Sequence, residues 1–522
     1  MSRLRYRRVI FAALVIAVLA GIYVAAGTSH RAAASGSSGQ VEKAAVSTAV
    51  RVCAAPGSSS PTSASVAVAA VPSSSASGAS ATTSGSATTN GSAVISPLVA
   101  GGSQTALPAA ATVTKPGVLQ ITDIKTAPAL TKAQQASQAG SSQDVTTQDS
   151  RGGVEVSATG PMAQGLEVEQ TSATGLVTAQ CGTPGTNFWF LGPGEASSAT
   201  IDLYLMNISS QPADAQVSVL TDVTNGPPLL GNADNGITVP PHSVVVQSLG
   251  KLVHASKILA LNVTTSVGQV VAAVRETRSA SDNGNWLPVT SPPSRHLVIP
   301  GLPRSSGSRS LYIAVPGTAA AQVKITAVTA NGSYQPTGGT GIDLLGGSAV
   351  AIALPSLGGV PGAITVTSSQ PVVATMLLPG GPAGTPGAIA VSAPQVFEQG
   401  VVADNPAHSH YSTDLVLSAP GKAARVRVTT ATSSISAAGQ QGSVVTIKAR
   451  SSVLVPVTSP PGSKATAFTL VVTPLSGSGP VYAGRIITAG GSVQSIMPVP
   501  SALTWIPLPS AGESLAAILN QQ

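Results

Sequence analysis

The chain has 522 residues, of which 9% are charged and 3% aromatic, with 54 glycines and 40 prolines. Its length allows for roughly three to five domains, and its small and β-branched residues suit paired sheets better than solvated helices. The formal net charge of +7 does not indicate nucleic-acid binding, which needs a concentrated basic face. Arg3, Arg5, Arg7 and Arg8 lie at the N-terminus, and the other basic residues nearly balance the 19 acidic ones.

Residues 9–26 read VIFAALVIAVLAGIYVAA and carry no charge. An apolar run of about 18 to 20 residues can cross a bilayer as a helix, and the preceding arginines keep the N-terminus in the cytoplasm. A signal peptide cleaved near residues 25–27 is the alternative; we favour an anchor because the run exceeds a signal core of about 7 to 15 residues. We therefore expect a cytoplasmic tip (1–8), a single transmembrane anchor (9–26), a flexible tether (27–48) and an ectodomain outside the cytoplasm.

Cys53 and Cys181 are the two cysteines of the chain. In an oxidising compartment two cysteines most simply form one disulfide, and two unrelated buried thiols are the alternative. The bond would tie the start of a first, smaller β domain (49–181) to its end. Within this domain the Ser-, Thr-, Ala- and Gly-rich tract 73–91 has no apolar periodicity, so we expect a loop or a disordered insert there.

Six short runs rich in β-branched and other apolar residues follow, separated by Pro, Gly, Asn and Asp. They lie at 201–205, 216–219, 236–239, 243–246, 258–263 and 269–274. This pattern predicts an antiparallel sandwich. Alternation assigns Ile201, Leu203, Leu205, Val217 and Val219 to the core, and Asp202, Tyr204 and Ser218 to the outer face.

The same pattern returns twice, about one immunoglobulin-like domain further along each time. Leu203 corresponds to Leu311 and Leu415, and Ser243 to Ser348 and Ser452. We therefore predict an all-β chain of tandem immunoglobulin-like β-sandwich modules after an N-terminal transmembrane helix, with modules at 182–294, 295–395 and 396–509 and a C-terminal tail at 510–522. A single continuous architecture such as a propeller is the alternative, and the lack of a repeat of about 40 to 50 residues argues against it.

Residues that could carry chemistry are sparse. His408 and His410 alternate and could supply two metal ligands, but a zinc site needs three or four, so an exposed loop is the simpler interpretation. The segments 232–236 and 282–285 resemble calcium loops without their acidic ligands, and we interpret both as turns. With no nucleophile elbow or phosphate-binding loop, we expect a protein that is not an enzyme and that has no catalytic residues, metal or cofactor.

Trp189, Trp286 and Trp505 each lie beside Pro- and Gly-rich sequence where two modules meet. Such rings can pack between modules, or can stack on sugars. We take the three tryptophans as the candidate interaction surface of the chain.

Three segments carry a family resemblance: CGTPGTNFWFLGPG at 181–194, WLP at 286–288 and VIPGL at 298–302. Together with the N-terminal apolar run, they resemble an actinobacterial family of exported, membrane-anchored proteins classed as a domain of unknown function. The resemblance covers about residues 50–510. It implies a Gram-positive, high-GC cell envelope and brings no assigned activity or catalytic residues.

The sequence thus favours an anchored envelope protein with a structural or protein-interaction role. A binding module for envelope polysaccharide or peptidoglycan is the second hypothesis, and an enzyme whose residues converge only in the fold is the third. The possible partners are an envelope protein or polysaccharide besides the membrane, and the sequence does not indicate an oligomeric state.

Overall fold

The computed structural model describes residues 43–54, 63–70, 92–100, 120–121, 142–146, 152–172, 177–194, 200–222, 229–230, 236–250, 256–277, 284–304, 307, 309–354, 357–378, 387–408, 410–431 and 442–507. The predicted anchor, the tract 73–91 and the tail 510–522 lie outside these ranges. In the described part, the secondary structure is strands and one 3-10 turn, η2 (Gly160–Ala163), and no helix there is long and apolar enough to span a bilayer. The all-β prediction is confirmed.

The chain forms two compact units. One contains both ends of the chain, and in it β1 (Lys43–Ala45) pairs antiparallel with β35 (Trp505–Pro507). The other, Val46–Thr504, contains all the remaining strands.

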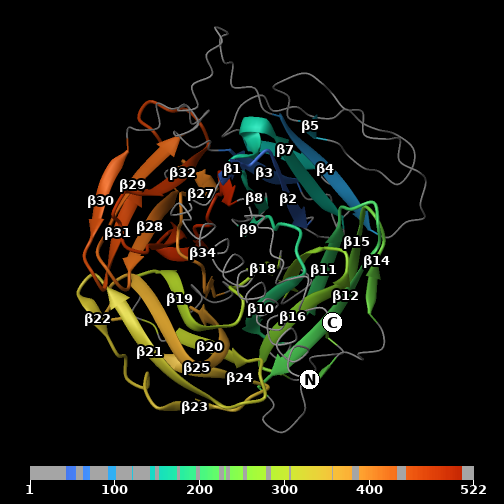
Figure 1. Ribbon diagram of the computed structural model, residues 1–522. Helices are drawn as coiled ribbons and strands as arrows, with labels where there is room; N and C mark the ends of the chain where they lie inside the picture. The colour runs from blue at the N-terminus through green and yellow to red at the C-terminus, as the bar shows by residue number, and fades with distance from the viewer. Residues whose placement is uncertain are drawn as a thin grey trace, which may run out of the picture. The chain divides into compact units, whose positions relative to one another are not determined.

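Residues 187–287 form the repeat that the sequence predicted most clearly. Its strands are β10 (Asn187–Pro193), β11 (Thr200–Asn207), β12 (Ala213–Thr221), β13 (Leu229–Leu230), β14 (Ile237–Val239), β15 (Ser243–Ser248), β16 (Ile258–Val267), β17 (Val271–Thr277) and β18 (Asn285–Leu287). They form two antiparallel sheets, β10-β16-β12 with β13 and β14 on β12, and β18-β17-β11-β15 (Figure 1). We call these sheet I and sheet II. Each of the six predicted runs overlaps a strand of this repeat, although 236–239 and 269–274 begin one and two residues before β14 and β17.

Residues 294–391 and 400–498 repeat this strand order. The first set is β19 (Ser294–Leu302), β20 (Arg309–Val315), β21 (Ala321–Thr329), β22 (Gly332–Tyr334), β23 (Ile342–Leu344), β24 (Ser348–Leu354), β25 (Gly362–Leu377) and β26 (Ile389–Val391). The second set is β27 (Gly400–Pro406), β28 (Tyr411–Ala419), β29 (Ala424–Ala431), β30 (Ser443–Ile447), β31 (Ser451–Val457), β32 (Ala467–Pro474), β33 (Tyr482–Ala489) and β34 (Ser492–Pro498). The long β25 pairs with β19 and β21 in sheet I and then with β20 in sheet II.

The first domain is a fourth copy of the same repeat, which the sequence comparison missed. Its strands are β2 (Thr48–Ala54), β3 (Ser63–Ala69), β4 (Ser92–Ala100), β5 (Gln120–Ile121), β6 (Ser142–Thr146), β7 (Gly153–Thr159), β8 (Glu167–Ser172) and β9 (Thr178–Gln180). Sheet I is β2-β7-β4 and sheet II is β9-β8-β3-β6, in the order of the later repeats. The copy was hidden because much more chain separates β4 from β6 than separates the matching strands elsewhere. We number the repeats 1 to 4 along the chain.

Each repeat encloses an apolar core between its two sheets. In repeat 2, Ile201, Leu203, Leu205 and Val219 are fully buried there and Val217 packs against them, as alternation predicted. The turn that precedes β15, β24 and β31 also recurs. The hydroxyls of Ser243, Ser348 and Ser451 donate to the carbonyl three residues earlier. Ser451, and not Ser452, is therefore the counterpart of Ser243.

Neighbouring repeats pack sheet I of one against sheet II of the next. Between repeats 1 and 2, Val52 and Ala54 pack with Tyr204, Met206, Val244 and Val271. Between repeats 2 and 3, the packed residues are Trp189, Leu191, Leu220, Ile258 and Ala260 with Tyr312, Ala314, Ala349 and Val373. Between repeats 3 and 4, Val298, Val328 and Ala363 pack with Tyr482, and Val416, Ile486 and Ile496 of repeat 4 join the apolar cluster of repeat 3. Between repeats 4 and 1, Val401, Ala403 and Val471 pack with Ala67 and Ala69. The four junctions form a closed cycle within Val46–Thr504. We call the last of them the closing junction.

This cycle explains why one predicted face was wrong. Tyr204 was assigned to the solvent side of its strand, yet only 3% of it is exposed. Alternation correctly points Tyr204 away from the core of repeat 2. However, that outer face of sheet II is covered by Val52 and Ala54 of repeat 1.

Candidate functional site

Trp189 lies in β10, where the consecutive aromatic residues divide between the two faces of the strand. Phe188 and Phe190 enter the core of repeat 2, while Trp189 and Leu191 point to the opposite face. There Trp189 packs with Tyr312 of repeat 3 and is 8% exposed. A large ring fills space that small side chains leave open, so Trp189 contributes to the junction between repeats 2 and 3.

Trp286 lies in β18, on the other sheet of the same repeat. Its ring meets Tyr204 edge-on at 5.3 Å between centroids, and the Cζ atom of Arg275 lies 6.0 Å from its centroid. In both arrangements the quadrupole of the Trp286 ring attracts its neighbour, the edge of the Tyr204 ring in one and the Arg275 cation in the other. Trp286 is half-buried and packs against the cluster that joins repeats 1 and 2.

Trp505 belongs to β35, opposite Ala45 in the smaller compact unit. Trp189 and Trp286 face different neighbouring repeats. The three tryptophans therefore occupy three separate settings.

His408 and His410 are exposed in the turn between β27 and β28. The ring of His410 lies edge-on to Tyr411, and the amide of Tyr411 donates to the carbonyl of His408. Across the described ranges, no three His, Cys, Asp or Glu side chains gather as metal ligands would. In the two segments that resemble calcium loops, residues 232–235 and 282–283 lie outside those ranges.

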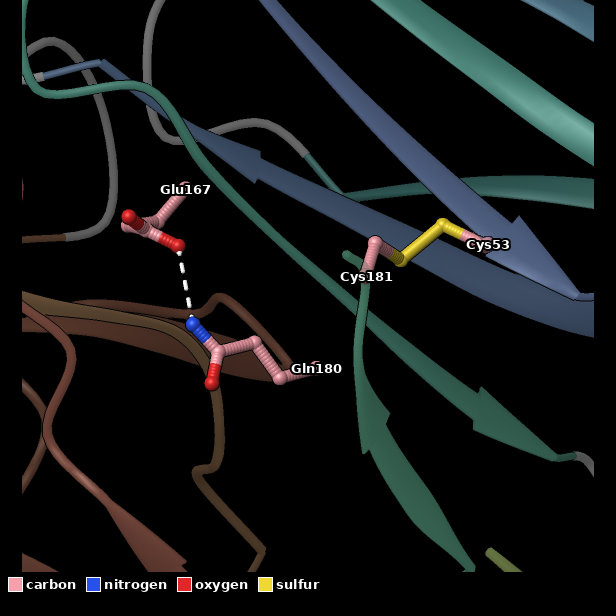
Figure 2. The surroundings of a disulfide bond; sticks show 4 residues. All are labelled: Cys53, Glu167, Gln180 and Cys181. Atoms are coloured by element: carbon pink, nitrogen blue, oxygen red, sulfur yellow. Dashed lines mark hydrogen bonds between the residues drawn. A yellow bond between two sulfur atoms is a disulfide. The ribbon is translucent and has the colours of Figure 1, made fainter. Parts of the chain in front are cut away.

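Cys53 and Cys181 form the predicted disulfide, with 4.4 Å between their Cα atoms (Figure 2). Cys53 comes from β2, and Cys181 directly follows β9. The bond therefore ties sheet I to sheet II of repeat 1, at the edge of its core. Beside it, the buried carboxylate of Glu167 accepts hydrogen bonds from Gln180 and Arg51.

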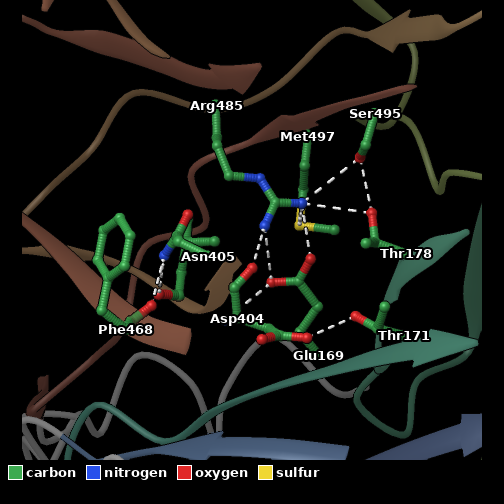
Figure 3. Close-up of polar contacts among 10 residues, drawn as sticks. Glu169, Thr171, Thr178, Asp404, Asn405, Phe468, Arg485, Ser495 and Met497 are labelled. Atoms are coloured by element: carbon green, nitrogen blue, oxygen red, sulfur yellow. Dashed lines mark hydrogen bonds and ion pairs between the residues drawn. The ribbon is translucent and has the colours of Figure 1, made fainter. Parts of the chain in front are cut away.

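The sequence did not reveal a buried ionic network at the closing junction (Figure 3). Arg485 of β33 is fully buried, and its two terminal nitrogens lie 2.6 and 3.1 Å from the two carboxylate oxygens of Glu169 in β8. One of these nitrogens also donates to the carbonyl of Asp404 in β27, at 2.6 Å. The pair therefore joins repeat 4 to repeat 1 with paired, charge-assisted hydrogen bonds.

Further polar groups complete this network. The Asp404 amide donates to Glu169, and the Thr171 hydroxyl donates to the Asp404 carboxylate. Thr178 of repeat 1 and Ser495 of repeat 4 share a hydrogen bond at 2.6 Å next to the guanidinium. The charges are thus held by protein groups from both repeats, which suits cohesion between them.

Comparison among the repeats shows that Arg485 replaces an apolar residue. In β33 it lies opposite Leu415, whereas Val274 lies opposite Leu203 and Met376 lies opposite Leu311. An arginine at a core position of one repeat is a signal that the sequence does contain. It becomes visible only when the strands are aligned by their pairing.

Two glutamates, the buried Glu169 and the half-buried Glu155, have raised pKa values. Burial raises the pKa of Glu169 to about 7, against the lowering effect of Arg485 and together with a raising effect of the Asp404 charge. Burial alone raises the pKa of Glu155 in β7 to about 7. Desolvation penalises the charged carboxylate in both cases.

Arg309, at the start of β20, is a second buried arginine. It is 1% exposed, and one terminal nitrogen donates to the carbonyl of Pro303 at 2.8 Å. Burial lowers its pKa from the ordinary value, while the nearby Tyr334 acts in the opposite direction.

Comparison with known proteins gives one family. No curated protein and no solved structure matches the chain. The model of a family of unknown function, DUF5719, matches residues 131–458, which is more than half of the chain. The match contains the three segments at 181–194, 286–288 and 298–302 that carried the resemblance, and it extends from the later part of repeat 1 into repeat 4. The chain therefore belongs to the DUF5719 family of unknown function.

Proposed function

We propose that the protein is an anchored, extracytoplasmic scaffold with a structural or protein-interaction role in the cell envelope. The observation that carries this proposal is the pairing of Cys53 with Cys181, since such bonds persist in oxidising compartments and are rare in the cytosol. The arginine-flanked apolar run at 9–26 supports the same location.

The distribution of the polar residues supports a role without catalysis. The buried charges Arg485 and Glu169 bind each other across two repeats, so their chemistry serves assembly. The candidate tryptophans Trp189 and Trp286 pack at the junctions between repeats. A body of four packed repeats, joined to the membrane by a tether, is suited to presenting surfaces to envelope partners.

The test is the location and the contacts of the full chain in intact cells. We expect the protein in the membrane fraction, cleaved by protease added outside, and cross-linked to specific envelope proteins. A soluble cytoplasmic chain with two reactive thiols after denaturation without reductant would contradict the proposal.

Binding to envelope polysaccharide is the second candidate, and one observation favours it. Unlike Trp189, Trp286 is only half-buried, and it lies beside the cation Arg275. Co-sedimentation with purified cell wall should then be lost in Trp286→Ala. It should persist in Tyr334→Ala, which removes an aromatic ring that is 42% exposed elsewhere. Equal sedimentation of both variants and the parent would eliminate this candidate.

A further inference from the structure

The closing junction differs from the other three because the two repeats that meet there are not consecutive in the chain. The polypeptide runs from repeat 1 to 2, from 2 to 3 and from 3 to 4, but repeat 4 meets repeat 1 without a covalent link between them. Whatever holds this junction closed must therefore be non-covalent. Its strength depends on packing and polar contacts alone.

The apolar packing at this junction is light. Its buried cluster consists of small side chains: Ala67, Ala69, Val401, Ala403, Val471 and Ala502. The junction between repeats 2 and 3 instead buries Trp189 and Tyr312 among leucine, isoleucine and valine. Because hydrophobic stabilisation scales with the apolar area removed from water, the closing junction gains less from burial.

The segment 499–504, which we call the strap, adds backbone hydrogen bonds at the closing junction. It lies between repeats 4 and 1 and contacts both of them. On the side of repeat 4, the amide of Ala502 donates to the carbonyl of Gln399, directly before β27. On the other side, the carbonyls of Leu503 and Thr504 accept from the amides of Gly165 and Val46.

The strap is also fixed by a side chain. The Thr504 hydroxyl donates to the Glu398 carboxylate at 2.8 Å, and Thr504 itself is 1% exposed. With the Arg485–Glu169 pair, these polar contacts hold a junction that lacks the large apolar side chains of the junction between repeats 2 and 3. Polar contacts exchange with water when they break, so they are easier to release than an equal area of packed apolar surface.

We propose that the closing junction is a releasable seam. The strap 499–504 and the Arg485–Glu169 pair hold it closed, and the cycle of repeats opens at this one junction. Release separates sheet I of repeat 4 from sheet II of repeat 1 and leaves the other three junctions intact. Such opening is a property of the fold and is independent of the proposed envelope role.

Cysteine protection tests the seam in the full chain, because both native cysteines are already paired. Ala69→Cys places a single thiol in the seam, while Ala314→Cys and Ala363→Cys place one in the junctions 2–3 and 3–4. All three alanines are fully buried. With rates normalised to the unfolded chain, the thiol at position 69 should be modified at least about tenfold faster than the other two, because local opening precedes global unfolding.

A second variant distinguishes opening of the seam from a loss of stability at all the junctions. Thr504→Val removes the hydroxyl that binds Glu398, so it should accelerate labelling at position 69 and leave positions 314 and 363 unchanged. Ala403→Cys reports on the same seam from repeat 4, should Ala69→Cys fail to fold. Equal labelling rates at all the junctions, or equal acceleration of all of them by Thr504→Val, would overturn the proposal.

Discussion

Gly484 of β33 lies directly against the backbone of Gly301 in β19, and a Cβ atom at position 484 would overlap the Cα atom of Gly301. The two strands belong to repeats 4 and 3. Gly301 also has a φ of 77°, which residues with side chains rarely adopt. The close approach of two backbones therefore fixes the distance between these repeats.

Gly484→Ala should consequently destabilise the protein by about 1–3 kcal/mol, because the added methyl group must push two sheets apart. Thermal unfolding measures the loss. Gly421→Ala is the matched control, since nothing lies within 4 Å of a Cβ atom there. Equal melting temperatures for the two variants would show that repeats 3 and 4 do not meet at this point.

Val219→Asp should unfold repeat 2, with a cost on the order of 4 kcal/mol or more, because it introduces a charge into a core with no partner. Val219 is fully buried in that core. Gln216→Asp, at an exposed position of the same strand, should leave the unfolding curve nearly unchanged. If Val219→Asp melts like the parent, the face assignment of β12 is wrong.

Glu155 predicts a dependence of stability on pH. Its pKa rises from 4.5 to about 7 on folding, so the folded state binds the proton more tightly than the unfolded state. The contribution of Glu155 to stability should therefore be largest below pH 4.5 and fall as the pH rises through 7. Glu155→Gln should raise the free energy of unfolding by about 1–3 kcal/mol at pH 8 and change it little at pH 4.

Denaturant unfolding at several pH values checks this sign. Some slope should remain in Glu155→Gln, because burial shifts the pKa of Glu169 in the same direction. A variant that is less stable than the parent at pH 8 would contradict the assignment.

The disulfide should contribute substantially to repeat 1. It spans 128 residues of sequence, and the chain-entropy model gives about 5 kcal/mol for such a loop, although removal of natural disulfides costs about 2–5 kcal/mol. The double variant Cys53→Ala/Cys181→Ala should lose stability within that range. The denatured, unreduced parent should show no reactive thiol, and two reactive thiols would refute the pairing.

Alternation and spacing were enough to predict the main strands of repeats 2 to 4, and the two cysteines of a chain expected to be exported were enough to predict the disulfide. They failed where a second layer covers the outer face of a sheet: Tyr204 was expected in solvent and is buried, because alternation identifies two faces but not what covers each of them. Repeat 1 was missed as a copy because its strands are spaced irregularly in sequence.

The ionic network could not be predicted, because its two charged partners are 316 residues apart. No local pattern links Glu169 to Arg485, and each alone looks like an ordinary charge within a strand. Only the strand pairing shows that Arg485 occupies a core position and that its partner comes from another repeat.

The most direct test of the closed cycle is a double-mutant cycle on this pair. Arg485→Met uses the residue that repeat 3 has at the matching position, and Glu169→Gln keeps an acceptor for the Asp404 amide. Glu169→Gln should lose about 3–5 kcal/mol by stranding the buried Arg485 charge, and Arg485→Met should lose less because Glu169 then takes up a proton. The double variant should lose much less than the sum of the two. Additive losses in the free energy of unfolding would mean that the two side chains do not meet and that repeat 4 does not close on repeat 1.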